Sequence, residues 1–173
     1  MKLSATLRFA TALACVAMAP PGVAVGSQFQ INAGLNDAWY ESSTNGQGFF
    51  VTVFPDSQKV FLSWFTYDLE RPADGVTAEL GEPGHRWLTA LGPYTGDTAT
   101  LDIELTQGGI FDSPTPAVVQ TPAYGTVILR FSNCAEGEVE YTIPSVGRSG
   151  TIPIRRTYAS PDNMALCETL QIP

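Results

Sequence analysis

The sequence predicts an all-β protein, a single antiparallel barrel or sandwich of about eight strands, most of them joined in an up-and-down meander. Short runs of β-branched and aromatic residues recur along the chain, and most of these runs alternate apolar with polar positions. The 16 glycines and 13 prolines separate the runs at short intervals, as turns between neighbouring strands require. No convincing helical period lies between the runs, which argues against parallel strand–helix–strand units.

The first predicted strands are rich in aromatic residues. We expect a short strand at 39–40 and a hairpin whose two strands are 48–54 and 59–67. The residues between these two runs, P-D-S-Q, are typical of a tight turn. Residues 68–85 then form the longest polar segment, in which alternating apolar residues at 76–80 indicate a short strand.

The second half of the chain carries the clearest alternation. At 98–106, Ala99, Leu101 and Ile103 are separated by polar residues, as in an antiparallel strand with one face on the core and the other toward water. The main exception to the short connections is the 112–123 segment, which we expect to wrap one rim of the barrel. The remaining strands are expected at 86–91, 124–131, 138–143 and 151–155.

Composition and charge restrict the class of protein. The chain is 44% hydrophobic, 15% charged and 10% aromatic, which fits one compact domain and excludes a coiled coil, a collagen-like chain or a disordered tail. Nine basic and 17 acidic residues give a formal net charge of −8, which disfavours unaided contact with nucleic-acid phosphates or anionic lipid. We therefore expect no nucleic-acid partner.

The N-terminal residues have the layout of a secretory signal peptide, which we expect at 1–26, leaving 27–173 as a single antiparallel β domain. Lys2 and Arg8 form a basic start, 9–19 is an apolar run, and small residues follow for a signal peptidase. The apolar run is shorter than the roughly 20 residues that span a membrane, and charged residues, Gly and Pro interrupt everything downstream. We expect a secreted or periplasmic protein without a transmembrane segment.

The three cysteines separate into one in the leader and a pair near the C-terminus. A lipid anchor at Cys15 is disfavoured, because Ala12 stands where a lipoprotein signal carries a large aliphatic residue. Cys134 and Cys167 are then an even pair in an exported chain, for which a disulfide is expected. This bridge would attach the tail, rich in turn formers at 160–163, to the end of a strand. We expect no metal at the pair, since no other cysteine survives processing and the chain has one histidine.

The hairpin at 48–54 and 59–67 is apolar on both faces. Such a strand pair lies inside a sandwich, lines a cavity, or exposes an aromatic patch to a partner. One interpretation is that its rings are core, since Phe and Trp dominate protein interiors. The alternative is a ligand surface, because aromatic rings stack on sugars or enclose apolar ligands, and barrel mouths are common sites. The candidate binding residues are Trp39, Tyr40, Trp64, Phe65, Tyr67 and Trp87.

No catalytic constellation is identifiable, and we expect a non-enzymatic protein without a cofactor. His85 is the one histidine, and no activated Ser or Cys can be named as its partner. The G-R-S-G-T run at 147–151 departs from a nucleophile elbow, because Thr151 stands where that motif needs glycine. The 68–85 loop offers carboxylates to a hydrolase, the least favoured alternative, but their separation is unreadable from sequence. These carboxylates are Asp68, Glu70, Asp74, Glu79 and Glu82.

Several motifs of the chain resemble a group of uncharacterised exported β-domain proteins of proteobacteria. They are W-Y at 39–40, G-Q-G-F at 46–49 and W-F-T-Y-D at 64–68, with further similarity at 84–90 and 108–112. The resemblance covers nearly the whole chain after the leader and implies export and a β-rich domain, and no activity, ligand or catalytic residue is carried over from it. The W-Y strand followed by a glycine turn and F-F-V-T is also similar to the first hairpin of avidin-type barrels, which favours a meander barrel.

The sequence leaves three hypotheses for function. The first is an exported, non-enzymatic β-domain that binds a carbohydrate or a small apolar ligand through its aromatic side chains. The second is a structural or interaction domain of the cell envelope, in which the aromatic patch contacts another protein or a second copy. The third is a hydrolase that uses the carboxylates of the 68–85 loop.

Overall fold

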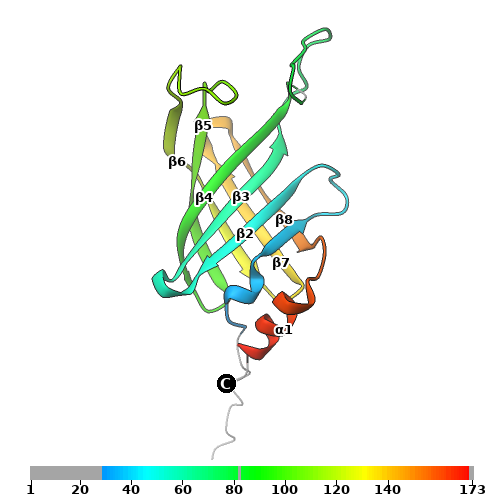
Figure 1. Ribbon diagram of the computed structural model, residues 1–173, viewed down its shortest axis with the longest axis vertical. Coiled ribbons are helices and arrows are strands. Elements are labelled where there is room, and N and C mark those ends of the chain that lie inside the picture. Colours follow the sequence, from blue (N-terminus) through cyan, green and yellow to red (C-terminus); the bar gives the residue numbers. More distant parts are fainter. Residues whose placement is uncertain (1–28, 82, 172–173) are drawn as a thin grey trace, which may run out of the picture.

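The computed structural model describes residues 29–81 and 83–171, so the predicted signal peptide, Cys15 and Glu82 lie outside the described residues. Eight antiparallel strands follow one another around a closed barrel in sequence order (Figure 1). This confirms the all-β meander and, of its two predicted forms, selects the barrel. The strands are β1 (Asp37–Tyr40), β2 (Gly48–Phe54), β3 (Lys59–Tyr67), β4 (His85–Thr95), β5 (Thr98–Gln107), β6 (Val119–Phe131), β7 (Glu136–Ile143) and β8 (Arg148–Arg156).

The barrel interior is filled by every second residue of the strands. Register places buried residues of neighbouring strands opposite one another, as with Val51 and Leu62. At Gly92 the strands approach so closely that an added Cβ would lie 2.0 Å from the Thr100 carbonyl oxygen. Only glycine fits there, because a side chain at this point would collide with the backbone of β5. The packed core therefore depends on the alternation of inward and outward side chains and on a glycine where two strands come closest.

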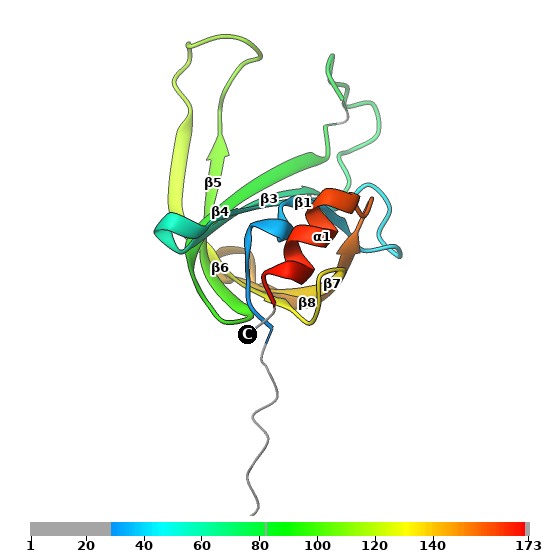
Figure 2. The same cartoon turned by 60° about the horizontal axis from the view of Figure 1, so that its bottom comes forward.

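One end of the barrel is sealed by helix α1 (Pro161–Thr169) and the short 3-10 helix η1 (Ala33–Leu35), which pack together across the strand ends (Figure 2). The two helices touch so closely that a Cβ on Gly34 would lie 2.2 Å from the Cys167 backbone nitrogen. The Asn163 side chain donates a 2.6 Å hydrogen bond to the Asn36 carbonyl beside η1. The sealed end thus joins the C-terminal segment to the residues that precede β1.

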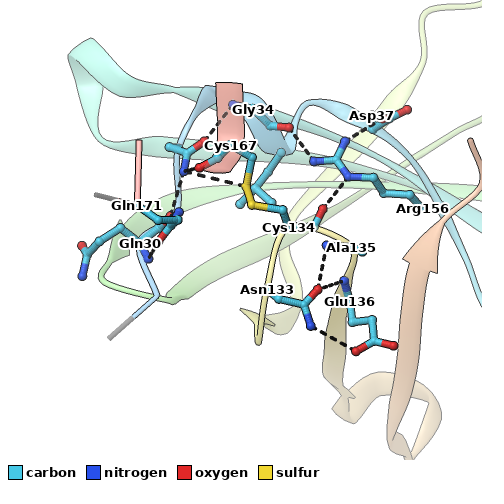
Figure 3. Close-up of a disulfide and its surroundings, with 12 residues drawn as sticks. Gln30, Gly34, Asp37, Asn133, Cys134, Ala135, Glu136, Arg156, Cys167 and Gln171 are labelled. Carbon is cyan, nitrogen blue, oxygen red and sulfur yellow. Dashed lines mark hydrogen bonds and ion pairs between the residues drawn. A yellow bond between two sulfur atoms is a disulfide. The ribbon is translucent and has the colours of Figure 1, made fainter. Parts of the chain in front are cut away.

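The predicted disulfide is present at this sealed end. Cys134, in the turn between β6 and β7, is bonded to Cys167 of α1, with a Cα–Cα distance of 5.9 Å (Figure 3). Asn133 shapes the same turn, because its side-chain oxygen accepts hydrogen bonds from the backbone N–H groups of Ala135 and Glu136 at 2.8 and 2.9 Å. The bridge therefore fastens α1 to a turn that is itself held by local hydrogen bonds.

A buried arginine lies beside the disulfide. Arg156 ends β8 with its side chain only 2% exposed and forms a 2.6 Å ion pair with Asp37 of β1. Its guanidinium also donates hydrogen bonds to the carbonyl oxygens of Cys134 and Gly34, and it lies 4.9 Å from the ring centroid of Trp39 (Figure 3). Each of the three guanidinium nitrogens thereby has a hydrogen-bond acceptor, and an aromatic ring lies against the cation.

Three local expectations differ from the structure. Residues 160–163 begin α1 instead of forming turns, since Pro at the first helical position and Asp in the first turn are also helix-start signals. The expected strand at 76–80 is absent, and Val76 and Leu80 lie exposed in the loop between β3 and β4. The 112–123 segment does not fold along the barrel end as a covering strap. Its last residues belong to β6, and 108–118 project from the barrel end as a loop (Figure 1).

Removal of the buried cation tests its role in the fold. Arg156→Met should lower the free energy of unfolding by about 3 kcal/mol or more, because Asp37 and two carbonyl groups lose their partner in a buried setting. Urea denaturation followed by tryptophan fluorescence measures this. The control is Arg155→Met, which removes the same charge from the exposed neighbouring position. Equal unfolding free energies for the two variants would contradict a stabilising role for Arg156.

Removal of the disulfide tests the attachment of α1. The double variant Cys134→Ser, Cys167→Ser should lose about 3 kcal/mol of unfolding free energy, because the crosslink spans 33 positions and restricts the unfolded chain. Reductant should destabilise the natural protein by a similar amount and leave the double variant unchanged. A natural protein whose urea midpoint is insensitive to reductant would argue against this contribution.

Candidate ligand-binding site

The end of the barrel opposite α1 is open and contains a cavity of about 1370 Å³. Its floor includes Trp64 of β3 and Tyr141 of β7, whose ring centroids are 5.1 Å apart across the interior. Trp64 also packs on Phe49 of β2, 5.5 Å away, which belongs to the core beneath. The walls are mostly aliphatic or aromatic and include Leu88, Leu105, Tyr124, Ile143 and Ile152. The core therefore fills the barrel near α1, whereas the cavity occupies the opposite end and the space between the loops above it.

A single amide side chain anchors the polar groups of the cavity. The Gln47 side-chain oxygen accepts hydrogen bonds from the indole Nε1–H of Trp64 at 3.2 Å and from the Thr66 hydroxyl at 2.7 Å. The Gln47 amide nitrogen donates to the Thr44 hydroxyl at 3.1 Å. These bonds fix the orientation of the Trp64 ring, because its only polar group has a partner.

The turn that carries Gln47 is organised by a carboxylate. Glu41 accepts hydrogen bonds from the hydroxyl and the backbone N–H of Ser43 and from the Thr44 hydroxyl. The bonds from Ser43, the side-chain bond foremost, hold the pKa of Glu41 below its ordinary value. The turn between β1 and β2 is therefore locally self-supporting and presents Gln47 to the cavity.

The rim of the cavity is formed by two long loops, 68–84 and 108–118, which project from the same end of the barrel (Figure 1). Both loops place large apolar side chains in water, the most exposed being Phe111 at 82%. Exposed apolar groups around a concave site are typical of surfaces that meet a ligand or a partner. The exposed apolar side chains of these two loops that line the cavity are Leu69, Leu80, Ile110, Phe111 and Val118.

The candidate binding residues named from the sequence separate into four places: the sealed end, the cavity floor, the surface beside Arg155, and the outer surface of β3 and β4. Trp39, 1% exposed, lies at the sealed end, where its Nε1–H donates to the Leu35 carbonyl and its ring is 5.0 Å from Phe131. Trp64, 6% exposed, lies in the cavity floor. Tyr40 is partly buried, and the Arg155 guanidinium lies over its ring, 5.8 Å from the ring centroid.

The other three candidates, Phe65, Tyr67 and Trp87, lie on the outer surface of the barrel, and Tyr67 and Trp87 also line the mouth of the cavity. Phe65 and Trp87 are directly opposite each other in the β3–β4 pair and are 46% and 54% exposed. Tyr67 follows on the same face, and its hydroxyl donates to the Asn45 carbonyl at 3.4 Å. We call this surface of β2, β3 and β4 the outer aromatic face. Its most exposed large apolar residues are Phe50, Phe54, Phe65, Tyr67, Trp87 and Leu91.

Several cavity residues were not among the sequence candidates. Tyr141 is the clearest case, because it lies two residues from both Val139 and Ile143 and so shares the inward face of β7 with them. The pattern predicted that strand, and a tyrosine at an inward position was a signal for a partly hollow interior. Gln47 carried no such signal, because its role depends on donors from another strand, the Trp64 indole N–H and the Thr66 hydroxyl.

The groups considered for catalysis do not assemble into a cluster. Asp68 forms a 2.7 Å ion pair with Arg86, and the His85 ring lies 5.5 Å from that of Tyr67. Glu70 and Asp74 are exposed in the loop. Within 29–81 and 83–171, no three His, Cys, Asp or Glu residues are grouped so as to hold a metal ion.

Neither a family model, nor a curated protein, nor a solved structure matches the chain. In the part of the chain that the structure describes, no helix has the length and apolar character needed to cross a membrane. The cavity and the outer aromatic face are therefore the two features of the molecule that bear on its function.

Proposed function

We propose that this protein binds a small, largely apolar ligand in the cavity at the open end of the barrel. The observation that carries the proposal is the cavity at the open end of the barrel, with an aromatic floor of Trp64 and Tyr141 and mostly apolar walls. A concave site in which apolar and aromatic side chains outnumber polar ones is the usual form of a small-molecule site. Its volume of about 1370 Å³ is ample for one ligand of this kind.

An apolar ligand fits better than a carbohydrate. A sugar needs many hydrogen-bond partners, whereas the side-chain oxygen of Gln47 is already occupied by Trp64 and Thr66. On the outer aromatic face the rings of Phe50 and Phe65 meet edge to face, at 84°, and do not form a flat platform for a sugar ring. Export belongs to the same proposal and is supported by the disulfide, because such bonds persist in oxidising compartments.

A cavity-filling variant tests the proposed function. Leu105→Trp adds a large ring inside the mouth and should weaken binding of the neutral apolar dye N-phenyl-1-naphthylamine by about tenfold or more, because the dye and the new ring compete for one space. Fluorescence titration measures the affinity. The matched control is Thr100→Trp, which places the same ring on the exposed outer side of β5 and should leave binding unchanged.

Two results would overturn the proposal. One is a natural protein that does not bind the dye. The other is dye binding that Leu105→Trp leaves intact, since the dye would then occupy the outer aromatic face or another surface.

The outer aromatic face favours a second candidate function, self-association with a second copy of the chain. The strands β2, β3 and β4 contain no Asp or Glu, although the chain has a net charge of −8. Acidic residues on the outside of β5 and β7 include Asp102, Glu104, Glu138 and Glu140. Two copies that meet through the outer aromatic face keep their acidic sides apart, which avoids like-charge repulsion.

The size of the face is adequate for such a contact. Half-exposed aromatic rings and Leu91 supply roughly 500–600 Å² of apolar surface, taking ~200 Å² for each ring. A standard interface takes roughly 800 Å² from each partner. Small neighbours on the same face, Thr52, Ser63 and Thr89, extend the surface without adding charge.

Sedimentation velocity over a range of concentrations tests the dimer. The natural protein should form a dimer, and the double variant Phe50→Ser, Phe65→Ser should be a monomer with its cavity intact, because both rings are exposed on the outer aromatic face and neither lines the cavity. Ile128→Ser removes an apolar side chain from the opposite outer surface and should remain dimeric. A natural protein that stays monomeric, or a double variant that stays dimeric, would exclude this contact.

A further inference from the structure

The carboxylate and guanidinium groups that line the cavity have a net charge opposite in sign to that of the whole chain. Among the described lining residues, Asp68 is the one carboxylate and Arg86 and Arg148 are the two guanidinium groups. Asp68 and Arg86 are joined in a 2.7 Å ion pair, and Arg86 also donates to the carbonyl oxygens of Pro83 and His85. One positive charge therefore remains at the cavity of a protein whose net charge is −8.

The remaining charge belongs to Arg148. Within 29–81 and 83–171 its side chain forms no hydrogen bond or ion pair with another described residue. Arg130, in comparison, pairs with Glu138 and Glu140, and Arg156 pairs with Asp37. Arg148 is thus a cation for which the described residues of this acidic chain supply no counter-ion.

Strand register places Arg148 on the cavity side of the barrel wall. It is directly opposite Ile143 in the β7–β8 pair, and residues opposite each other in antiparallel strands share a face. Ile143 is buried and lines the cavity, so Arg148 lies at the lip on the same face. The guanidinium is exposed, where it can meet a ligand that enters from water.

Below Arg148 the wall becomes aromatic. The next inward pair along the two strands is Tyr141 and Gly150, and a Cβ at Gly150 would lie 3.0 Å from the Tyr141 hydroxyl oxygen. The absence of a side chain at Gly150 leaves room for the Tyr141 ring, whose centroid lies 5.1 Å from that of Trp64. The cavity therefore runs from a cation at its lip to two aromatic rings at its floor.

We propose that the ligand is an amphipathic monocarboxylate, with its carboxylate on Arg148 and its apolar body on Trp64 and Tyr141. This inference rests on the proposed function and names the ligand class for the same cavity. The planar guanidinium can donate two parallel hydrogen bonds to a carboxylate, which gives the head group a fixed place at the lip. The apolar body gains by leaving water for the floor and walls.

A matched pair of probes tests the head group. Decanoate and decan-1-ol share a ten-carbon chain and differ in the charged end, and each is used to displace bound N-phenyl-1-naphthylamine from the full protein at pH 8. Decanoate should displace the dye at about tenfold lower concentration than decanol, because the ionised carboxylate gains charge-assisted hydrogen bonds to Arg148. Arg148→Gln should abolish this preference and leave the affinities for decanol and the dye unchanged.

The control variant is Arg155→Gln. It removes the same charge from the same strand, but on the outer surface above Tyr40, so the preference for decanoate should persist. Loss of the preference in both variants would indicate a non-specific effect of net charge and overturn the inference. Equal displacement by decanoate and decanol in the natural protein would also overturn it, while dye binding sensitive to Leu105→Trp would leave the proposed function standing. Absence of dye binding would overturn both.

Discussion

The barrel closes through a short seam that depends on one buried cation. β1 and β8 share two residue pairs, Trp39 with Arg156 and Tyr40 with Arg155, which is the smallest contact between neighbouring strands. Arg156 strengthens the seam because its guanidinium reaches Asp37, Gly34 and Cys134 at the same time. A side chain with five N–H donors in a rigid fork can satisfy three segments that no short polar residue would reach together. The first and last strands are therefore held mainly from the sealed end.

This arrangement explains why the opposite end can remain hollow. The disulfide, α1 and the buried arginine stabilise the lower half, where rings and branched side chains fill the interior. The upper half carries Gln47 and Thr66, which hydrogen-bond to each other, and Tyr141, whose ring packs on Trp64 beside the cavity. Stability and a potential binding site thus occupy different halves of one barrel.

Much of the fold could be predicted from local sequence patterns. The division of the aromatic residues between the cavity and the outer surface could not. Alternation of apolar and polar residues located the strands, and the even cysteine pair gave the disulfide. Trp64 and Phe65 are adjacent in one strand, yet one ring faces the cavity and the other faces water. The alternating faces were visible in the sequence, but the face that lies inside the barrel depends on which strands close around it. The helix at 161–169 was missed because its first residues also favour turns, and a disulfide holds it in place.

A meander with an even number of strands separates its connections into two sets. The connections 55–58, 96–97 and 132–135 lie at the sealed end and are short, whereas 41–47, 68–84, 108–118 and 144–147 surround the open end. Length can change in the second set without shifting any strand register, because a surface loop adds little closure entropy as it grows. The architecture therefore lets evolution vary what enters the barrel by exchanging loops, while the chemistry that keeps the barrel folded is inherited unchanged.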